Sequence, residues 1–186
     1  MPHTRTPVMS SAARRRVISA LLLICLGYFW IFNLSALPFS VQAVKDAGCG
    51  QGLLDTRLHY DAAAVSQAFT CYSSSGRTMY RDFLLLDASF ALCYGFGFSL
   101  LLMRWLVMLS ARNNRWRVVA LLPLAVAGFD LLENGSLLYL LAIYPAAVPG
   151  LATLAGLFTS IKWLLGATSL LALVACCALA LWRRGR

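Results

Sequence analysis

Four long apolar segments constrain this chain more than any other feature. They run through residues 17–36, 83–103, 118–141 and 151–182. Each has the twenty or so residues that cross about 30 Å of hydrocarbon as a helix rising about 1.5 Å per residue. Backbone groups in lipid must be paired within their own segment, so segments of this length are α-helices. Only 12% of the 186 residues are charged, well below a soluble domain, and we therefore predict an all-α membrane protein, a bundle of four transmembrane helices.

The positions of the arginines orient this bundle. Arginines occupy the tail 1–16, the turn 104–117 and the end 183–186, and no Asp or Glu lies in these three segments. The positive-inside rule then makes both termini cytoplasmic and places the loop 37–82 and the turn 142–150 outside. Topology thus explains the net charge of +9, and no recognition motif is present, so we expect no nucleic-acid partner. We expect a multi-pass protein of the bacterial inner membrane, with the lipid bilayer as a partner.

The outer loop carries local signals of its own. Asp61 can cap a short helix over about 61–69, whose apolar residues share one face. Cys49 and Cys71 are the only two cysteines outside the apolar segments, so we expect a disulfide that stabilises the loop by about 3 kcal/mol. The segment that precedes the loop is either a span or the core of a cleaved secretory signal, and its length favours the span.

Polar side chains interrupt three of the apolar segments. Asp87 lies in the second, Asp130, Glu133 and Asn134 lie in the third, and Lys162 lies in the fourth. A charged side chain in hydrocarbon costs about 2.5 kcal/mol or more, so each is expected to face the bundle interior and to have a partner. The spacing i, i+3 and i+4 puts the three residues of the third segment on one helical face. We therefore predict one polar site inside the bundle.

Lys162 is the expected partner of Asp130 or Glu133. The third and fourth segments are joined by a short turn, and side chains lean toward the N-terminus of their own helix, so Lys162 and Asp130 lean toward one another. With Asp87, three acids then face one lysine, and at least one acid is expected to be protonated or solvated. Alternatively, the cluster only fixes how the helices pack.

Further residues extend the predicted site. Tyr94 falls on the same helical face as Asp87, and Thr159 on the same face as Lys162. Asn33 lies in the outer half of the first segment, where it belongs either to the site or to the headgroup region. No histidine lies in an apolar segment, and Lys162 would compete with Mg²⁺ or Ca²⁺ for the carboxylates, so we expect no metal and no cofactor.

Short motifs connect the chain to a known group of proteins. Gly76-Arg77-x-x-Tyr80 and Asp130-x-x-Glu133-Asn134, together with Asp87, Tyr94 and Lys162, resemble the pattern of a family of small, uncharacterised bacterial four-span membrane proteins. The resemblance covers the chain from the outer loop onward, and it implies a four-span bundle without an activity. The chain is more faintly similar to four-span sterol-binding and sterol-isomerising membrane proteins, whose pockets contain helix-borne acids, and no residue role is transferred from them.

A polar site with an apolar surround favours the binding of an amphiphilic or lipid-like molecule in the outer half of the bundle. The expected tail contacts include Phe98 and Phe158. The expected ligand-binding residues are Asn33, Asp87, Tyr94, Asp130, Glu133, Asn134, Thr159 and Lys162. The first alternative is an enzyme that acts on a lipid or isoprenoid substrate, with Asp130 or Glu133 as acid–base group and Lys162 as electrostatic stabiliser. The others are proton-coupled transport and an accessory role in a homo-oligomer or larger membrane complex.

Overall fold

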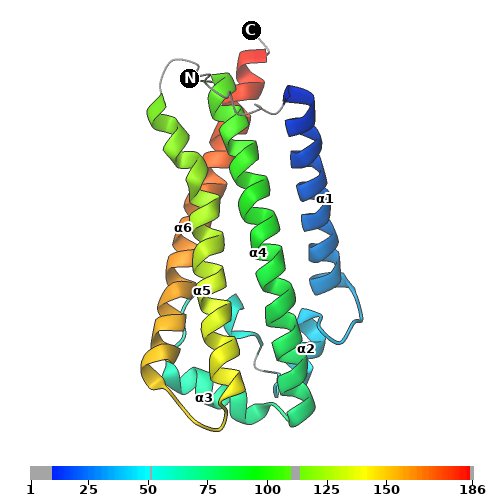
Figure 1. Cartoon of the computed structure of the whole chain (residues 1–186), viewed down its shortest axis with the longest axis vertical. Helices are drawn as coiled ribbons and strands as arrows, with labels where there is room; N and C mark the ends of the chain where they lie inside the picture. Colours follow the sequence, from blue (N-terminus) through cyan, green and yellow to red (C-terminus); the bar gives the residue numbers. More distant parts are fainter. Residues whose placement is uncertain (1–9, 51, 110–113, 185–186) are drawn as a thin grey trace, which may run out of the picture.

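A bundle of four long helices forms the molecule (Figure 1). The computed structural model describes residues 10–50, 52–109 and 114–184. The long helices are α1 (Ser11–Leu34), α4 (Ser74–Leu109), α5 (Leu122–Ala142) and α6 (Pro149–Arg184). All four are long and apolar enough to cross a membrane. The predicted fold class, an all-α protein with four candidate transmembrane helices packed together, is confirmed.

The helix ends gather at two poles. The start of α1 and the ends of α4 and α6 lie at one pole, drawn at the top of Figure 1. The turn from α5 to α6 lies at the other pole, together with the segment that joins α1 to α4 (Figure 1). We call this second pole the loop pole. The arrangement is the one that four successive spans require, and which side faces the cytoplasm stays a prediction.

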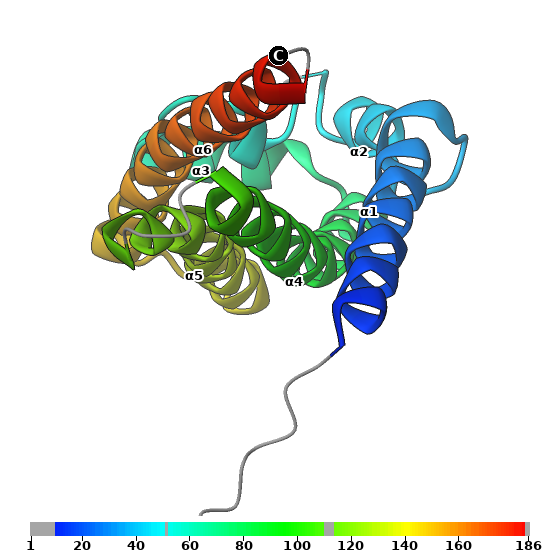
Figure 2. The ribbon, with the colours of Figure 1, turned by 90° about the horizontal axis from the view of Figure 1, so that it is seen from above.

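The helix α4 organises the bundle. It contacts α1, α5 and α6, and α1 lies on the opposite side of α4 from α5 (Figure 2). A glycine allows α4 to lie close to α5, because a Cβ atom at Gly95 would lie only 2.6 Å from the Ala127 Cβ of α5. The helices α4 and α6 have 36 residues each, or about 54 Å at about 1.5 Å per residue. Each therefore extends well beyond the hydrocarbon, which is about 30 Å thick.

The segment between α1 and α4 folds into the loop pole of the bundle. It contains α2 (Val41–Ala47), the single-turn helix η1 (Leu54–Thr56) and α3 (Ala62–Cys71), and another 3₁₀ helix, η2 (Asn114–Leu121), precedes α5. The side chain of Asp61 caps α3 by accepting the Ala64 amide at 2.8 Å. Leu53 and Leu54 are each only 1% exposed. The main core contains residues of this segment and of the long helices: Phe32, Val44, Leu53, Leu54, Tyr60, Val65, Phe69, Tyr80, Phe83, Leu84, Leu137 and Leu140. We call this segment between α1 and α4 the inserted segment, because its side chains form part of the core of the bundle.

The predicted disulfide is wrong, because Cys49 and Cys71 are both free. Cys71 ends α3, and Cys49 follows the C-cap residue of α2 with a positive φ of 56°. This backbone turn directs the Cys49 thiol toward the backbone carbonyl oxygen of Cys71, at 3.6 Å, and the two sulfur atoms are not bonded. The sequence therefore indicated that the two residues are neighbours, but the direction of the thiols depends on the turn.

Candidate functional site

The predicted ion pair between α5 and α6 is present. Lys162 Nζ lies 2.8 Å from Asp130 Oδ1 and 2.6 Å from Glu133 Oε2. The two acids are three residues apart on α5, so one ammonium group reaches both. The lysine side chain is 11% exposed, and the side chains of Asp130 and Glu133 are 6% and 0% exposed. This is a buried cluster, in which removal of the single cation would leave two carboxylates without their partner.

Two tyrosines bind the other oxygen atoms of these acids. The Tyr94 hydroxyl, on α4, donates to Asp130 Oδ2 at 2.8 Å, and the Tyr60 hydroxyl, from the residues before α3, donates to Glu133 Oε1 at 3.1 Å. Burial, and then the Glu133 charge, raise the pKa of Tyr60, so its phenol keeps its proton. A close backbone approach makes this contact possible, because a Cβ atom at Gly156 would overlap the Tyr60 carbonyl group.

The third predicted acid, Asp87, is bound to an amide. Asn134 Nδ2 donates to Asp87 Oδ2 at 2.8 Å, which joins α5 to α4. Asp87 is 8% exposed and Asn134 is 1% exposed. Within the described ranges, Asn134 Oδ1 has no hydrogen-bond partner. Asp87 is thus a buried carboxyl group beside the ion-pair cluster, and its hydrogen-bond donor is neutral.

A fourth acid, Asp55, joins these three, and the sequence analysis missed it. It lies in η1 and is only 9% exposed. In the part of the chain that the structure describes, its Oδ1 atom has no hydrogen-bond partner. Burial raises the pKa of Asp55 well above its usual range, the charge of Asp87 raises it further, and Lys162 acts in the opposite direction. The available signal was its position after two leucines in a loop, because an apolar pair there indicates a buried turn.

The acids line a cavity of about 400 Å³, which we call the acid cavity. Its ionisable lining residues are Asp55, Asp87, Tyr94, Asp130 and Lys162. The other walls come from every long helix and from the inserted segment: Phe32, Asn33, Val41, Thr56, Phe83, Phe90, Val126, Trp163 and Gly166. Glu133 and Asn134 bind residues of the cavity wall: Glu133 pairs with Lys162, and Asn134 donates to Asp87.

A second cavity of about 200 Å³, which we call the apolar cavity, adjoins the first. Its walls are Tyr94, Phe98, Pro123, Val126, Gly166, Ser169, Leu170 and Leu173. Tyr94, Val126 and Gly166 line both cavities, which therefore meet at these three residues. Later residues of α4 and α6 line the apolar cavity, so it extends away from the loop pole. A cavity with acids in its wall thus lies next to an apolar one.

The predicted site residues divide into two groups. The structure brings six of them together: Asp87, Tyr94, Asp130, Glu133, Asn134 and Lys162. Asn33 lies at the edge of the acid cavity, is exposed, and donates to the Phe29 carbonyl oxygen at 3.1 Å. Thr159 is fully buried and donates to the Ala155 carbonyl oxygen of its own helix at 3.1 Å. The Phe158 ring packs against the Phe129 ring, with 6.1 Å between the ring centroids, and Phe158 lines neither the acid cavity nor the apolar cavity.

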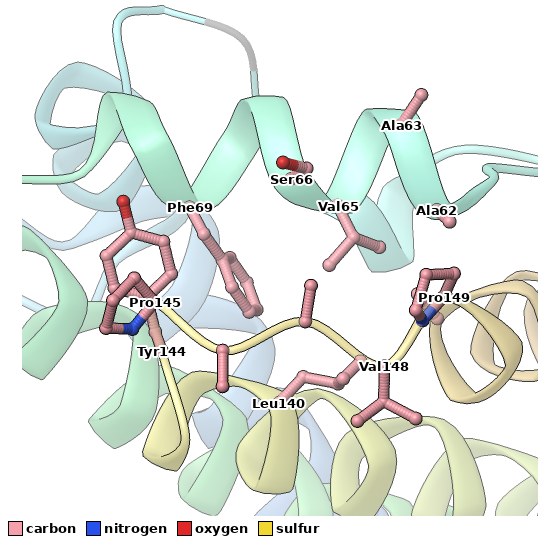
Figure 3. Close-up of a pocket in the computed structure, with 13 residues that line it drawn as sticks. Ala62, Ala63, Val65, Ser66, Phe69, Leu140, Tyr144, Pro145, Val148 and Pro149 are labelled. Atoms are coloured by element: carbon pink, nitrogen blue, oxygen red, sulfur yellow. The ribbon is translucent and has the colours of Figure 1, made fainter.

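A separate pocket of about 280 Å³ lies at the loop pole (Figure 3). Val65 and Phe69 of α3 face Leu140 and the turn from α5 to α6 across it. Its lining contains no charged side chain, and none of the four buried acids reaches it. Its polar side chains are the hydroxyl-bearing Ser66 and Tyr144, and the candidate site is therefore the acid cavity.

The described part of the chain contains no group of three or more His, Cys, Asp or Glu side chains that could hold a metal ion. Comparison with protein-family models, with curated proteins and with solved structures gives no match. The fold and the site therefore define the class of protein directly: a multi-span helical membrane protein with buried carboxyl groups. The resemblance to small bacterial four-span proteins extends to this architecture and assigns no family.

Proposed function

We propose that this protein, in the bacterial inner membrane as its sequence predicts, binds an amphiphilic or lipid-like molecule across the two neighbouring cavities. The observation that supports this most is the junction at Tyr94, Val126 and Gly166, three residues that line both the cavity of about 400 Å³ with acids in its wall and the apolar cavity of about 200 Å³. Sites for small molecules are usually apolar with a few convergent polar groups that fix orientation. The ligand head would lie at the acids and its tail in the apolar cavity.

The polar wall is well suited to binding because it is fixed in advance. Lys162, Asp130 and Glu133 hold one another, and Tyr94 and Tyr60 occupy the remaining carboxylate oxygens. A site whose side chains are already ordered loses less conformational entropy when the ligand arrives. The same rigidity also suits an enzyme, so turnover is a separate question from binding.

The walls of the acid cavity also favour a ligand that arrives from the bilayer. Asn33 of α1 is exposed, and Trp163 of α6 is 44% exposed, although both line the cavity. The cavity therefore reaches the outer surface of the bundle between these two helices. A lipid-like molecule can enter there without crossing water.

Blocking the junction tests this function. Leucine in place of Gly166 would fill the meeting point of the cavities, and it is sterically tolerable because no atom lies within 4 Å of a Cβ atom built there. Gly135→Leu is the matched control, since Gly135 is an exposed helix residue of α5 with the same open space. The probes are decylamine, decanol and decanoate, titrated onto the full chain in non-ionic detergent and measured by native mass spectrometry.

We expect saturable binding of at least one probe to the wild-type protein and to Gly135→Leu, and loss of that binding in Gly166→Leu. Equal thermal unfolding temperatures of the two variants would show that the loss is local. Failure of all three probes to saturate the wild-type protein, or full binding by Gly166→Leu, would refute the proposed function.

A further inference from the structure

The buried groups around the acid cavity are unbalanced in charge. Asp55, Asp87, Asp130 and Glu133 are all at most 9% exposed. Lys162 forms ion pairs with two of them, Asp130 and Glu133 of α5. Asp55 and Asp87 come from other elements, and the hydrogen-bond donor of Asp87 is a neutral amide. The cavity therefore has more potential negative charge than its lysine can balance.

One acid in the wall of the cavity has unused bonding capacity. Asp55 lines the cavity, is nine-tenths buried, and its Oδ1 atom accepts no hydrogen bond within the described residues. A buried acceptor without a donor is costly, so such an atom indicates that a donor is supplied from elsewhere. Because Asp55 is a wall residue of the acid cavity, a ligand bound there lies beside this carboxyl group.

Aromatic side chains form another part of the lining. Phe32, Phe83, Phe90, Tyr94 and Trp163 all line the acid cavity. The first four form a continuous row from α1 to α4, with ring centroids 5.1 Å apart for Phe32 and Phe83, 5.8 Å for Phe32 and Phe90, and 5.2 Å for Phe90 and Tyr94. Aromatic rings attract ammonium groups, whereas a phosphate or carboxylate would meet the acids with like charge.

We propose that the ligand head is a positively charged amine, bound by Asp55 and Asp87 beside the aromatic row. Lys162 keeps its pairing with Asp130 and Glu133 and serves to orient the α5 acids. An ammonium group brings a donor and a positive charge next to the Asp55 carboxyl group, and this charge favours the ionised form of the acid. This inference rests on the proposed function and narrows the ligand class to lipophilic amines.

The three decyl probes separate charge from apolar fit, because only their heads differ. At pH 7.5 we expect decylamine to bind the full chain at least about tenfold more tightly than decanol, and decanoate to bind more weakly than decanol. Asp55→Asn should reduce decylamine affinity at least about tenfold and leave decanol affinity unchanged. Asp46→Asn is the control, because Asp46 is an exposed acid of α2 that is bonded to Gln42 at 2.8 Å, and it should change neither affinity.

Each negative result identifies which part of the proposal is wrong. Equal affinity for decylamine and decanol, or tighter binding of decanoate, would overturn the amine assignment and leave amphiphile binding intact. Undiminished decylamine affinity in both Asp55→Asn and Asp87→Asn would overturn the assignment of the head position. Absence of saturable binding by all three probes would refute the proposed function itself.

Discussion

Removal of the Lys162 charge is the sharpest test of the site geometry. Lys162→Met keeps most of the length of the side chain and deletes the ammonium group that lies 2.8 Å from Asp130 and 2.6 Å from Glu133. Because both acids are buried, the variant leaves uncompensated charge in a medium that solvates it poorly. Breaking a buried ion pair from one side costs about 3–5 kcal/mol, and we expect a loss of that size.

The chain contains a control with the same bond length and different burial. Arg81 and Asp82 are also 2.8 Å apart, but their side chains are 56% and 45% exposed. Exposed pairs contribute about 0–1 kcal/mol, so Arg81→Met should have almost no effect on stability. The two variants therefore compare a buried cation shared by two acids with an exposed cation paired with one acid.

The free energy of unfolding is measured by equilibrium SDS titration in mixed micelles, for both variants and the wild-type protein. Lys162→Met combined with Asp130→Asn and Glu133→Gln should recover much of the loss, because a buried cluster replaced as a whole by neutral groups is close to neutral in stability. A loss below about 1 kcal/mol for Lys162→Met would refute the buried cluster, since that is the size of an exposed pair.

Two further predictions concern the inserted segment. Gly156→Ala should destabilise the protein by about 1–3 kcal/mol, because the new Cβ atom overlaps the Tyr60 carbonyl group. Gly128→Ala is the control, because a Cβ atom at Gly128 meets open space and should not destabilise the protein. The same SDS titration measures both variants. Asp55 should make the free energy of unfolding depend on pH. Its pKa is raised in the folded state, so the folded protein keeps a proton that the unfolded chain releases above about pH 4. Stability therefore falls as the pH rises from about 4 to the pKa of Asp55 in the folded state. Asp55→Asn should flatten that part of the pH profile of thermal unfolding, and an unchanged slope would contradict the burial of this acid.

The ion-pair cluster was predictable because continuous helices carry the residues that form it. A helix has fixed rise and fixed rotation per residue, so sequence spacing alone put Asp130 and Glu133 on one face. The short turn between α5 and α6 made the two helices neighbours and set them in opposite directions, which directed Lys162 toward these acids. Helix geometry was therefore sufficient to predict this ion pair. In the structure, Lys162 Nζ lies 2.8 Å from Asp130 and 2.6 Å from Glu133.

The inserted segment was not predictable in the same way. Residues 35–73 have no long periodic pattern, and their path is set by which side chains find space at the loop pole. Leu53 and Leu54 are buried there and bring Asp55 with them into the cavity. The same limit explains the error at Cys49, whose thiol lies 3.6 Å from the Cys71 carbonyl oxygen while both cysteines are free.

The surplus of acids argues against a purely structural role for the site. One lysine and the acids of α5 would be enough to fix how α5 and α6 pack, and a buried ionic group can act in this way without chemistry. Asp55 lies outside that ion-pair cluster, its Oδ1 atom has no donor in the described structure, and its burial costs desolvation. A feature that lowers stability and faces a cavity is best explained by what the cavity holds. The contact that Asp55 lacks is therefore the strongest reason to seek a ligand, and an ammonium group supplies both the donor and the charge.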